Sequence, residues 1–432
     1  MAVAPHLVEP LSRVLLGRLA DARARTDELF SLIKADALYD RPIPERHRIV
    51  FYIGHLEAFD WNLLRERLFP IAPFHADFDR LFAFGIDPVD GGLPKDRPDD
   101  WPAIAQVREY VARVRSELDV ELDSIFDGPE RKTEFAPDLL LNVAIEHRLM
   151  HAETLGYMFH QLPLDRKVRP SADEVIETLS IKERMIHIPE GVVTLGLSRS
   201  SGVFGWDNEF EQEQVEVPAF EIDEFKVTNE QFLGFLNSGG YKNRDLWTEA
   251  DWKWRSDAGI DHPVFWVPRD GQWFYRGMFE EISLPLNWPV YLSHAEASAY
   301  ARWAGKSLPT EAQWQRAAFG ENGQIAGMGN FDFRRWDPAP VNSQMAGRSQ
   351  YGVGDIFGNG WEWTSSLFAP LPGFQKFPFY PGYSADFFDG KHYVMKGGSS
   401  RTAACMMRPS FRNWFQPHYQ YVYAGFRCVR SA

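Results

Sequence analysis

The sequence has few cysteines, no long apolar run and no excess of positive charge, and each absence excludes a class of protein. Two cysteines in 432 residues do not make a disulfide framework, so a reducing cytoplasm is the expected compartment. No apolar run approaches the ~20 residues that span a bilayer. Residues 1–10 lack the charged start and apolar stretch of a signal peptide. The net charge of −14 argues against nucleic acid or an anionic membrane as the main partner.

The chain is too long for a single ordinary hydrophobic core, and its amino-acid composition changes near the middle. Hydrophobic residues make up 44% and charged residues 25%, which is typical of globular proteins. Only Trp61 and Trp101 of the 15 tryptophans precede residue 200. Beyond a polar linker near residues 165–173 the chain is rich in glycine, proline and short apolar runs. We therefore expect two domains, residues 1–170 and residues 171–432.

Apolar residues recur at helical spacing in four segments of the first half. These segments are residues 8–35, residues 46–68, a stretch that begins after Pro102, and residues 139–162. Between the second and third, residues 70–98 hold five prolines and three glycines, which predicts a long loop. Four helices with one long crossover predict a four-helix bundle, an architecture that builds metal sites in its core.

Three histidines interrupt the apolar faces of two of these helices. His147 and His151 lie four residues apart, on one helical face, in a His-x-x-x-His-x-Glu pattern. His55 interrupts the apolar stripe of the second helix in the same way. Each could be an ordinary core histidine, but a buried imidazole needs a partner and one metal ion can use several. Three imidazoles with open coordination positions suit both zinc and iron(II), and the residues alone do not choose between them.

The composition and short apolar runs of the second half predict an irregular α+β domain. Ser293 and Thr310 each begin a capping box, so helices are expected to follow them and to end near Gly305 and Gly320. Short strands are expected at residues 185–188, 192–197, 215–222, 393–396 and 425–429.

A set of short motifs occurs in a fixed order along this half, at residues 205–209, 227–229, 308–314, 358–364, 397–399 and 425–427. The set resembles the formylglycine-generating-enzyme (sulfatase-modifying) fold, a relative of C-type lectins. The first half resembles the DinB-like metal-binding bundle. The two halves in this order are similar to the ergothioneine-biosynthesis sulfoxide synthases, the EgtB family, and the resemblance covers nearly the whole chain.

The resemblance implies a multidomain α and α+β protein, in which a DinB-like four-helix bundle precedes a C-type-lectin-like (sulfatase-modifying-enzyme) α+β domain. His55, His147 and His151 match the family's metal motif and would hold Fe(II). The implied reaction uses dioxygen to join a thiol to the imidazole of N-α-trimethylhistidine (hercynine) as a sulfoxide. The expected partners are these small molecules, without nucleic acid or membrane. Zinc could position a thiolate but could not supply the redox step.

The resemblance also assigns a substrate segment to residues 412–414. Trp414 and Phe415 are candidates for an aromatic wall around the trimethylammonium group. Ordinary core packing is the alternative for both, and it competes more strongly for Phe415 than for Trp414. Asn413 can hydrogen-bond a carboxylate or an imidazole. Arg412, or alternatively Arg408, could pair with a substrate carboxylate.

Family members need a proton donor near dioxygen, usually a tyrosine. Tyr380 is our candidate for this catalytic role, and Tyr383 in the same segment is the alternative. Either could instead be a packing tyrosine.

Two residues depart from the branch of the family that uses γ-glutamylcysteine. Met150 stands where that branch usually has glutamine, and Phe415 where it usually has aspartate. Residues 70–98 also offer no match for its carboxylate-binding arginine. We therefore expect cysteine as the thiol. A sister reaction stays open, such as ovothiol-type 5-histidylcysteine sulfoxide formation or a selenium-donor version.

Three other functions compete with this interpretation. A zinc-dependent thiol transferase of the DinB type would use the same three histidines. A non-catalytic binding module would have no reason to keep three buried imidazoles. Formylglycine generation needs a reactive cysteine pair, and Cys405 and Cys428 do not have suitable spacing.

Overall fold

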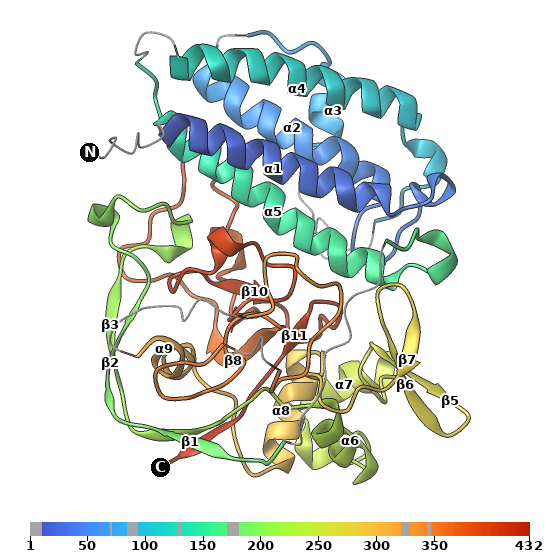
Figure 1. Ribbon diagram of the computed structural model, residues 1–432, viewed down its shortest axis with the longest axis vertical. Helices are drawn as coiled ribbons and strands as arrows, with labels where there is room; N and C mark the ends of the chain where they lie inside the picture. The colour runs from blue at the N-terminus through green and yellow to red at the C-terminus, as the bar shows by residue number, and fades with distance from the viewer. Residues whose placement is uncertain are drawn as a thin grey trace, which may run out of the picture. The chain divides into compact units, whose positions relative to one another are not determined.

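The computed structural model describes residues 11–69, 71–83, 94–127, 132–170, 181–320, 329–343 and 347–432. The chain divides into two compact units, Met1–Pro170 and Ser171–Ala432 (Figure 1). The first is helical and the second combines sheets with short helices, which confirms the predicted fold class. No helix in the described ranges combines the length and apolar content that a bilayer span requires.

The N-terminal unit is the expected bundle. Its four long helices are α1 (Leu11–Ser31), α2 (Ile49–Leu68), α4 (Ile104–Asp127) and α5 (Pro137–Gln161). Helix α5 packs against α1 and α2, and α2 also packs against α4. The apolar faces that the sequence shows at helical spacing are buried in these contacts, because only there can they leave water.

The segment predicted as a long loop is partly helical. It contains α3 (Ala76–Leu81) and a 3-10 turn at Pro98–Asp100, while residues 70 and 84–93 lie outside the described residues. The ring of Phe78 in α3 packs on Tyr110 of α4 at 5.5 Å between centroids, which gives this short helix a buried face. Asp100 accepts a hydrogen bond from the Arg97 amide and so caps the 3-10 turn.

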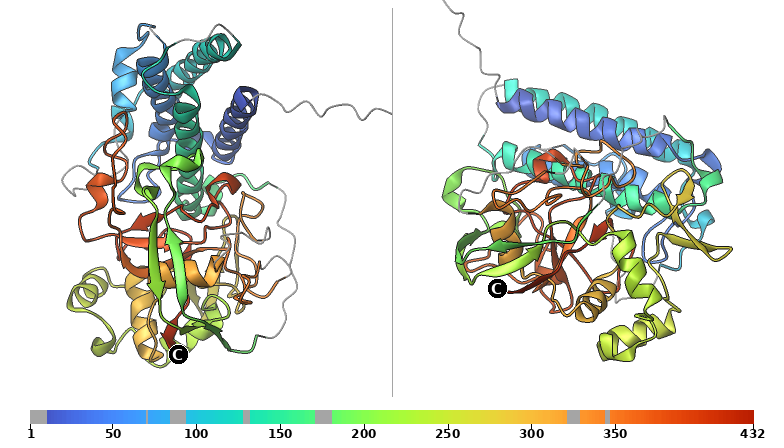
Figure 2. Two further views of the ribbon diagram at one scale, coloured as in Figure 1. Left: turned by 90° about the vertical axis from the view of Figure 1, so that its left-hand side faces the viewer. Right: turned by 60° about the horizontal axis from the view of Figure 1, so that its bottom comes forward.

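The described strands of the C-terminal unit form four small sheets. Figure 1 labels most of these strands, and Figure 2 shows the unit from two further sides. Their hydrogen-bonded orders are β1-β4-β12, β10-β9-β8-β11, β2-β3 and β5-β6-β7. Every pair of strands is antiparallel except β11 and β8, which are parallel. The strands are β1 (Met185–Ile188), β2 (Gly191–Leu195), β3 (Glu213–Val217), β4 (Phe220–Asp223), β5 (Trp266–Arg269), β6 (Gln272–Arg276), β7 (Glu281–Ser283), β8 (Trp361–Leu367), β9 (Tyr393–Lys396), β10 (Asn413–Phe415), β11 (Ala424–Gly425) and β12 (Val429–Ser431).

The strands predicted at residues 185–188 and 393–396 match β1 and β9, and β2 lies within two residues of its predicted range. Two predicted strands are each split in two. The range 215–222 contains the end of β3 and the start of β4, because Pro218 between them has no N–H to donate to a ladder. The range 425–429 contains the end of β11 and the start of β12, which pair with different sheets.

Four short helices complete this unit: α6 (Asn229–Asn237), α7 (Glu249–Asp257), α8 (His294–Trp303) and α9 (Glu311–Phe319). Both predicted capping boxes are present at the starts of α8 and α9. In the first, the Glu296 amide donates to Ser293 Oγ at 3.3 Å and the Ser293 amide donates to Glu296 Oε2 at 2.9 Å. Trp314 of α9 lies in a buried core with Ile188 of β1 and Ile222 of β4.

A fully buried set of four charges lies in this unit. Lys226 Nζ donates to the carbonyls of Asp355 and Gly358 and lies 3.4 Å from a carboxylate oxygen of both Asp355 and Glu362. Arg427 donates to both carboxylate oxygens of Glu362, at 2.6 and 2.8 Å. Burial raises the pKa of Asp355 to about 6, and Lys226 opposes that shift. The two cations balance the two carboxylates, so the whole set is stable only when complete.

We expect Lys226→Met to lower the free energy of unfolding by about 3–5 kcal/mol, because it leaves a buried carboxylate and two carbonyls without their cation. Urea unfolding of the full chain, followed by tryptophan fluorescence, measures this loss. Lys253→Met removes an exposed ion pair with Asp257 and is the matched control, for which we expect little change. Equal effects of the two substitutions would contradict the interpretation.

Candidate metal centre

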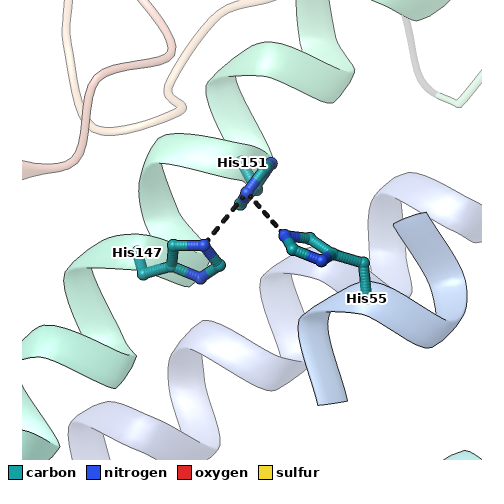
Figure 3. A group of neighbouring side chains, drawn as sticks. All are labelled: His55, His147 and His151. Atoms are coloured by element: carbon teal, nitrogen blue, oxygen red, sulfur yellow. Dashed lines mark hydrogen bonds between the residues drawn. The ribbon is translucent and has the colours of Figure 1, made fainter. Parts of the chain in front are cut away.

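Three imidazoles converge in the core of the helical bundle (Figure 3). His55 comes from α2, and His147 and His151 come from successive turns of α5. His151 Nε2 lies 3.2 Å from His55 Nε2 and 3.2 Å from His147 Nε2. Each side chain is 4% exposed. The structure therefore brings together the three histidines that the sequence singled out, from segments almost a hundred residues apart.

The spacing of the three nitrogens suits a single bound ion. Nitrogens held by one ion at ~2.1 Å lie ~3.0–3.4 Å apart in tetrahedral or octahedral arrangements. Both Nε2 separations of 3.2 Å fall in this range, and one ligand atom from each histidine lies within 4.8 Å of the others. Within the described residues, this is the one group of His, Cys, Asp or Glu that meets that criterion.

The hydrogen bond on the far side of His55 fixes the orientation of its ring. His55 Nδ1 lies 2.6 Å from the Phe82 carbonyl, and since a carbonyl can only accept, Nδ1 carries the proton. The lone pair is then on Nε2, which faces the other two rings. A Cβ at Gly54 would lie 2.5 Å from the Phe82 ring, so glycine before His55 allows this approach.

Burial keeps all three imidazoles neutral. It lowers the pKa of His55 to about 4, against a smaller opposing effect of the Phe82 hydrogen bond. Burial likewise holds the pKa of His147 and of His151 well below the ordinary value, and the neighbouring imidazoles add to the effect. Neutral imidazole is the form that binds a metal, so at neutral pH protons do not compete for these lone pairs.

Aromatic rings line the sides of the centre. Phe51 stacks on His55 at 4.8 Å between centroids and Phe59 stacks on His147 at 3.4 Å. These rings exclude polar groups from the sides of the imidazoles. His47 is half-buried, and its ring lies 4.2 Å from that of Phe51 in a tilted arrangement.

Sequence reasoning missed the carbonyl of Phe82 as a partner of the centre. A backbone oxygen has no residue-type signature, and Phe82 lies in the segment predicted as loop. Gly54 offers the only local signal, because a glycine inside a buried helix face indicates close approach by another group.

The tyrosine and tryptophan candidates of the C-terminal unit form one aromatic cluster. The ring of Tyr383 stacks on Trp206 at 3.9 Å and lies 5.5 Å from Trp414. Tyr380 lies 5.6 Å from Tyr383, and Trp414 stacks on Phe368 at 4.1 Å. Tyr383 is buried, whereas Tyr380 and Trp414 are only half-buried. Their roles as proton donor and cation wall stay predictions.

The segment that carries the two tyrosines is held by a buried carboxylate. Asp207 accepts hydrogen bonds from Ser384 Oγ at 2.6 Å and from the Phe377 amide at 3.4 Å. Burial raises the pKa of Asp207 although both hydrogen bonds act to lower it. One side chain thus ties down both ends of residues 377–384.

Both arginine candidates have protein partners. Arg412 is 3% exposed, and its Nε and Nη2 donate to the two carboxylate oxygens of Glu311 at 2.9 and 3.1 Å. Arg408 Nε donates to Glu209 Oε2 at 2.8 Å. These contacts give each guanidinium a structural partner, and the pairing of either with a substrate carboxylate stays a prediction.

The remaining substrate candidates, Asn413 and Phe415, lie in β10 and are half-buried. Asn413 Oδ1 accepts a hydrogen bond from the Trp414 amide at 2.9 Å, and Phe415 stacks on Tyr419 at 5.0 Å. Packing against neighbouring side chains is the alternative to substrate binding that we gave for Phe415. Substrate binding by either residue stays a prediction.

Comparisons with known proteins agree with both halves of the chain. A family model described as the sulfatase-modifying factor enzyme 1-like domain matches residues 174–432, and the DinB superfamily matches residues 18–155. A hercynine oxygenase of Mycolicibacterium smegmatis is 33% identical over 96% of this chain and 97% of its own length. A hercynine oxygenase of Mycolicibacterium thermoresistibile is 33% identical over 75% of this chain and 74% of its own length.

A fungal relative is similar along most of this chain. Ergothioneine biosynthesis protein 1 of Neurospora crassa is 27% identical over 93% of this chain, which corresponds to 56% of that longer protein. The family matches agree with the bundle and with its buried histidine centre. The chain belongs to the hercynine oxygenase family of ergothioneine-biosynthesis oxidoreductases, sulfoxide synthases in which a DinB domain precedes a sulfatase-modifying-factor-like domain.

Proposed function

We propose that this enzyme uses Fe(II) and dioxygen to join cysteine to the imidazole ring of hercynine, forming a sulfoxide. The observation that carries the proposal is the convergence of three buried, neutral imidazoles in a chain of this family. The overall reaction balances: a C–S bond and an S–O bond form, an S–H and a C–H bond break, and dioxygen is reduced to the sulfoxide oxygen and water. We place the reaction in the cytoplasm.

The three histidines suit this chemistry because they leave coordination positions open. When bound, Fe(II) would supply activation of dioxygen and positions for both organic substrates. His55, His147 and His151 would hold the ion through Nε2, with the Phe82 carbonyl fixing the ring of His55. Phe51 and Phe59 would exclude water from the sides of the imidazoles.

Residues of the C-terminal unit would bind and protonate the substrates. Trp414, half-buried in β10, offers a ring face to the trimethylammonium group. Tyr380 would donate the proton that dioxygen reduction consumes, because its ring is half-buried whereas that of Tyr383 is buried on Trp206. Cysteine is preferred over γ-glutamylcysteine because Met150 and Phe415 are apolar where the dipeptide-using branch has glutamine and aspartate.

Metal analysis with an oxygen electrode tests the metal assignment. We expect activity of the full chain with Fe(II) and no activity with Zn²⁺, together with dioxygen uptake that matches product formation. Full activity of a zinc-loaded chain without oxygen would instead support the zinc-dependent thiol transferase, which the same three-histidine set also suits.

We expect His151→Ala to abolish Fe(II) binding and turnover, because it removes the imidazole nearest to both others. The C-terminal unit should stay folded, which tryptophan fluorescence reports. His187→Ala changes an exposed histidine of β1 and is the matched control, expected to behave as the wild type. Turnover retained by His151→Ala would exclude this centre as the active site.

Cysteine and γ-glutamylcysteine should be compared as thiol donors at saturating hercynine. We expect a higher kcat/KM for cysteine, because no polar replacement for the glutamine and aspartate of the other branch is present at Met150 and Phe415. Clear preference for the dipeptide would refute the choice of donor and leave the rest of the proposal standing.

We expect Tyr380→Phe to lower kcat by about 100- to 10,000-fold with little change in KM, as loss of a proton donor does. Tyr383→Phe is the matched comparison, since that ring lies in the same segment. If Tyr383→Phe carried the loss and Tyr380→Phe did not, the two roles would have to be exchanged.

A further inference from the structure

Arg148 follows His147 directly in α5, and its side chain is completely buried. It reaches α2 at three points. Its Nη1 donates to Glu57 Oε1 at 2.9 Å, and its Nη2 donates to Asp60 Oδ2 at 2.6 Å and to the Leu56 carbonyl at 3.1 Å. Leu56 is the residue after His55. Arg148 therefore joins the two metal-binding helices one residue away from a predicted ligand on each helix.

The contacts of Arg148 extend to the other two long helices. Arg148 Nη1 lies 3.3 Å from Thr26 Oγ1 of α1. Arg115 of α4 donates to Glu57 Oε1 at 2.7 and 2.9 Å and to both carboxylate oxygens of Asp27 in α1, at 2.7 and 2.8 Å. Glu57 is thus shared by arginines of α4 and α5.

The geometry of a guanidinium makes this contact sensitive to helix register. A shift of α5 by one residue moves its side chains by ~1.5 Å along the axis and turns them by a fraction of a turn. Apolar side chains can adjust to such a shift. The planar guanidinium of Arg148 cannot, because its N–H groups must meet three fixed acceptors on α2. Metal ligands tolerate only about 0.2 Å in bond length. A contact that fixes register beside the histidines therefore fixes where the three Nε2 atoms meet.

We propose that Arg148, through Glu57, Asp60 and the Leu56 carbonyl, is the positioning residue of the metal centre, and sets α5 against α2 so that His147 and His151 meet His55. The inference rests on the proposed function in one respect, that the three histidines bind a metal. It assigns to Arg148 no contact with metal or substrate.

A purely structural role for Arg148 makes a different prediction. Breaking a buried ion pair by removing one partner is strongly destabilising, whereas replacing all its members by neutral groups is often neutral. If Arg148 only contributed stability, a neutralised network would restore both the fold and metal affinity. If Arg148 positions the ligands, neutralisation would restore the fold and leave metal affinity low.

The experiment uses the full chain, freed of metal and titrated with Co²⁺, whose visible absorption reports both affinity and coordination geometry. The variants are Arg148→Met, Arg148→Lys and the neutralised triple variant Glu57→Gln/Asp60→Asn/Arg148→Met. Arg23→Met is the matched control, because Arg23 is also a buried arginine of the bundle but joins α1 to Asp119 of α4, helices that carry no histidine of the centre. Thermal unfolding by circular dichroism is measured on each.

We expect Arg148→Met and the triple variant to bind Co²⁺ about 10- to 100-fold more weakly than the wild type, with a changed spectrum. The triple variant should melt closer to the wild type than Arg148→Met does. Arg148→Lys keeps the charge without the fork and should also bind Co²⁺ more weakly, which tests the inference even if Arg148→Met does not fold. Arg23→Met should lose stability but keep wild-type affinity and spectrum.

A folded triple variant or Arg148→Lys with the affinity and spectrum of the wild type would overturn the positioning role. Failure of the proposed function looks different: the wild type itself would bind neither Co²⁺ nor Fe(II), or His151→Ala would bind as the wild type does. In the first case the centre stands and Arg148 is structural, and in the second the centre itself is wrong.

Discussion

The packing of α2 against α5 is the constraint on which the candidate metal centre depends. Neither helix supplies a site alone, since α5 carries two imidazoles and α2 carries one. The third nitrogen is in place only when the two helices are in a single register, and the separation of 3.2 Å between His55 Nε2 of α2 and His151 Nε2 of α5 shows how little room that register leaves. A bundle held by apolar contacts alone has several near-equivalent registers. The buried hydrogen bonds and ion pairs of Arg148 can all form in only one register, so they favour that register over the others.

Burial acts on the centre in two opposing ways. Removing three imidazoles from water is unfavourable, and among the described residues the Phe82 carbonyl is the acceptor that His55 Nδ1 meets. The same burial lowers the pKa of each imidazole and so keeps the lone pairs available. Burial of the three imidazoles thus lowers the stability of the metal-free bundle and at the same time prepares the site for a cation. This is the usual relation between a preorganised site and the stability of its scaffold.

Much of this arrangement is predictable from the sequence because it rests on local rules. Helical periodicity places His147 and His151 on one face, and the capping boxes at Ser293 and Thr310 define the starts of two helices. Contacts with a particular partner far along the chain are harder to predict. The bidentate ion pair of Arg412 with Glu311, about a hundred residues away, is an example, because the sequence does not say which carboxylate a given arginine meets. The split of the strand predicted at residues 215–222 is the exception, because Pro218 was a local signal that could have been used.

The C-terminal unit uses buried carboxylates to hold the segments in which the substrate candidates lie. Asp207 anchors residues 377–384 through Ser384 and the Phe377 amide. Glu209 accepts from Arg408 and from Ser410 Oγ, and Glu311 accepts from Arg412.

The three acids therefore fix two irregular segments that have little regular secondary structure of their own. An aromatic side chain on such a segment can be held as firmly as one on a strand, provided that its backbone is tied at both ends. The backbone around Tyr380, and the residues that precede Trp414 in β10, are therefore positioned by charged side chains of this unit. An arginine in a family motif can thus support a site through its ion pair, and pairing of Arg412 with a substrate carboxylate stays a prediction.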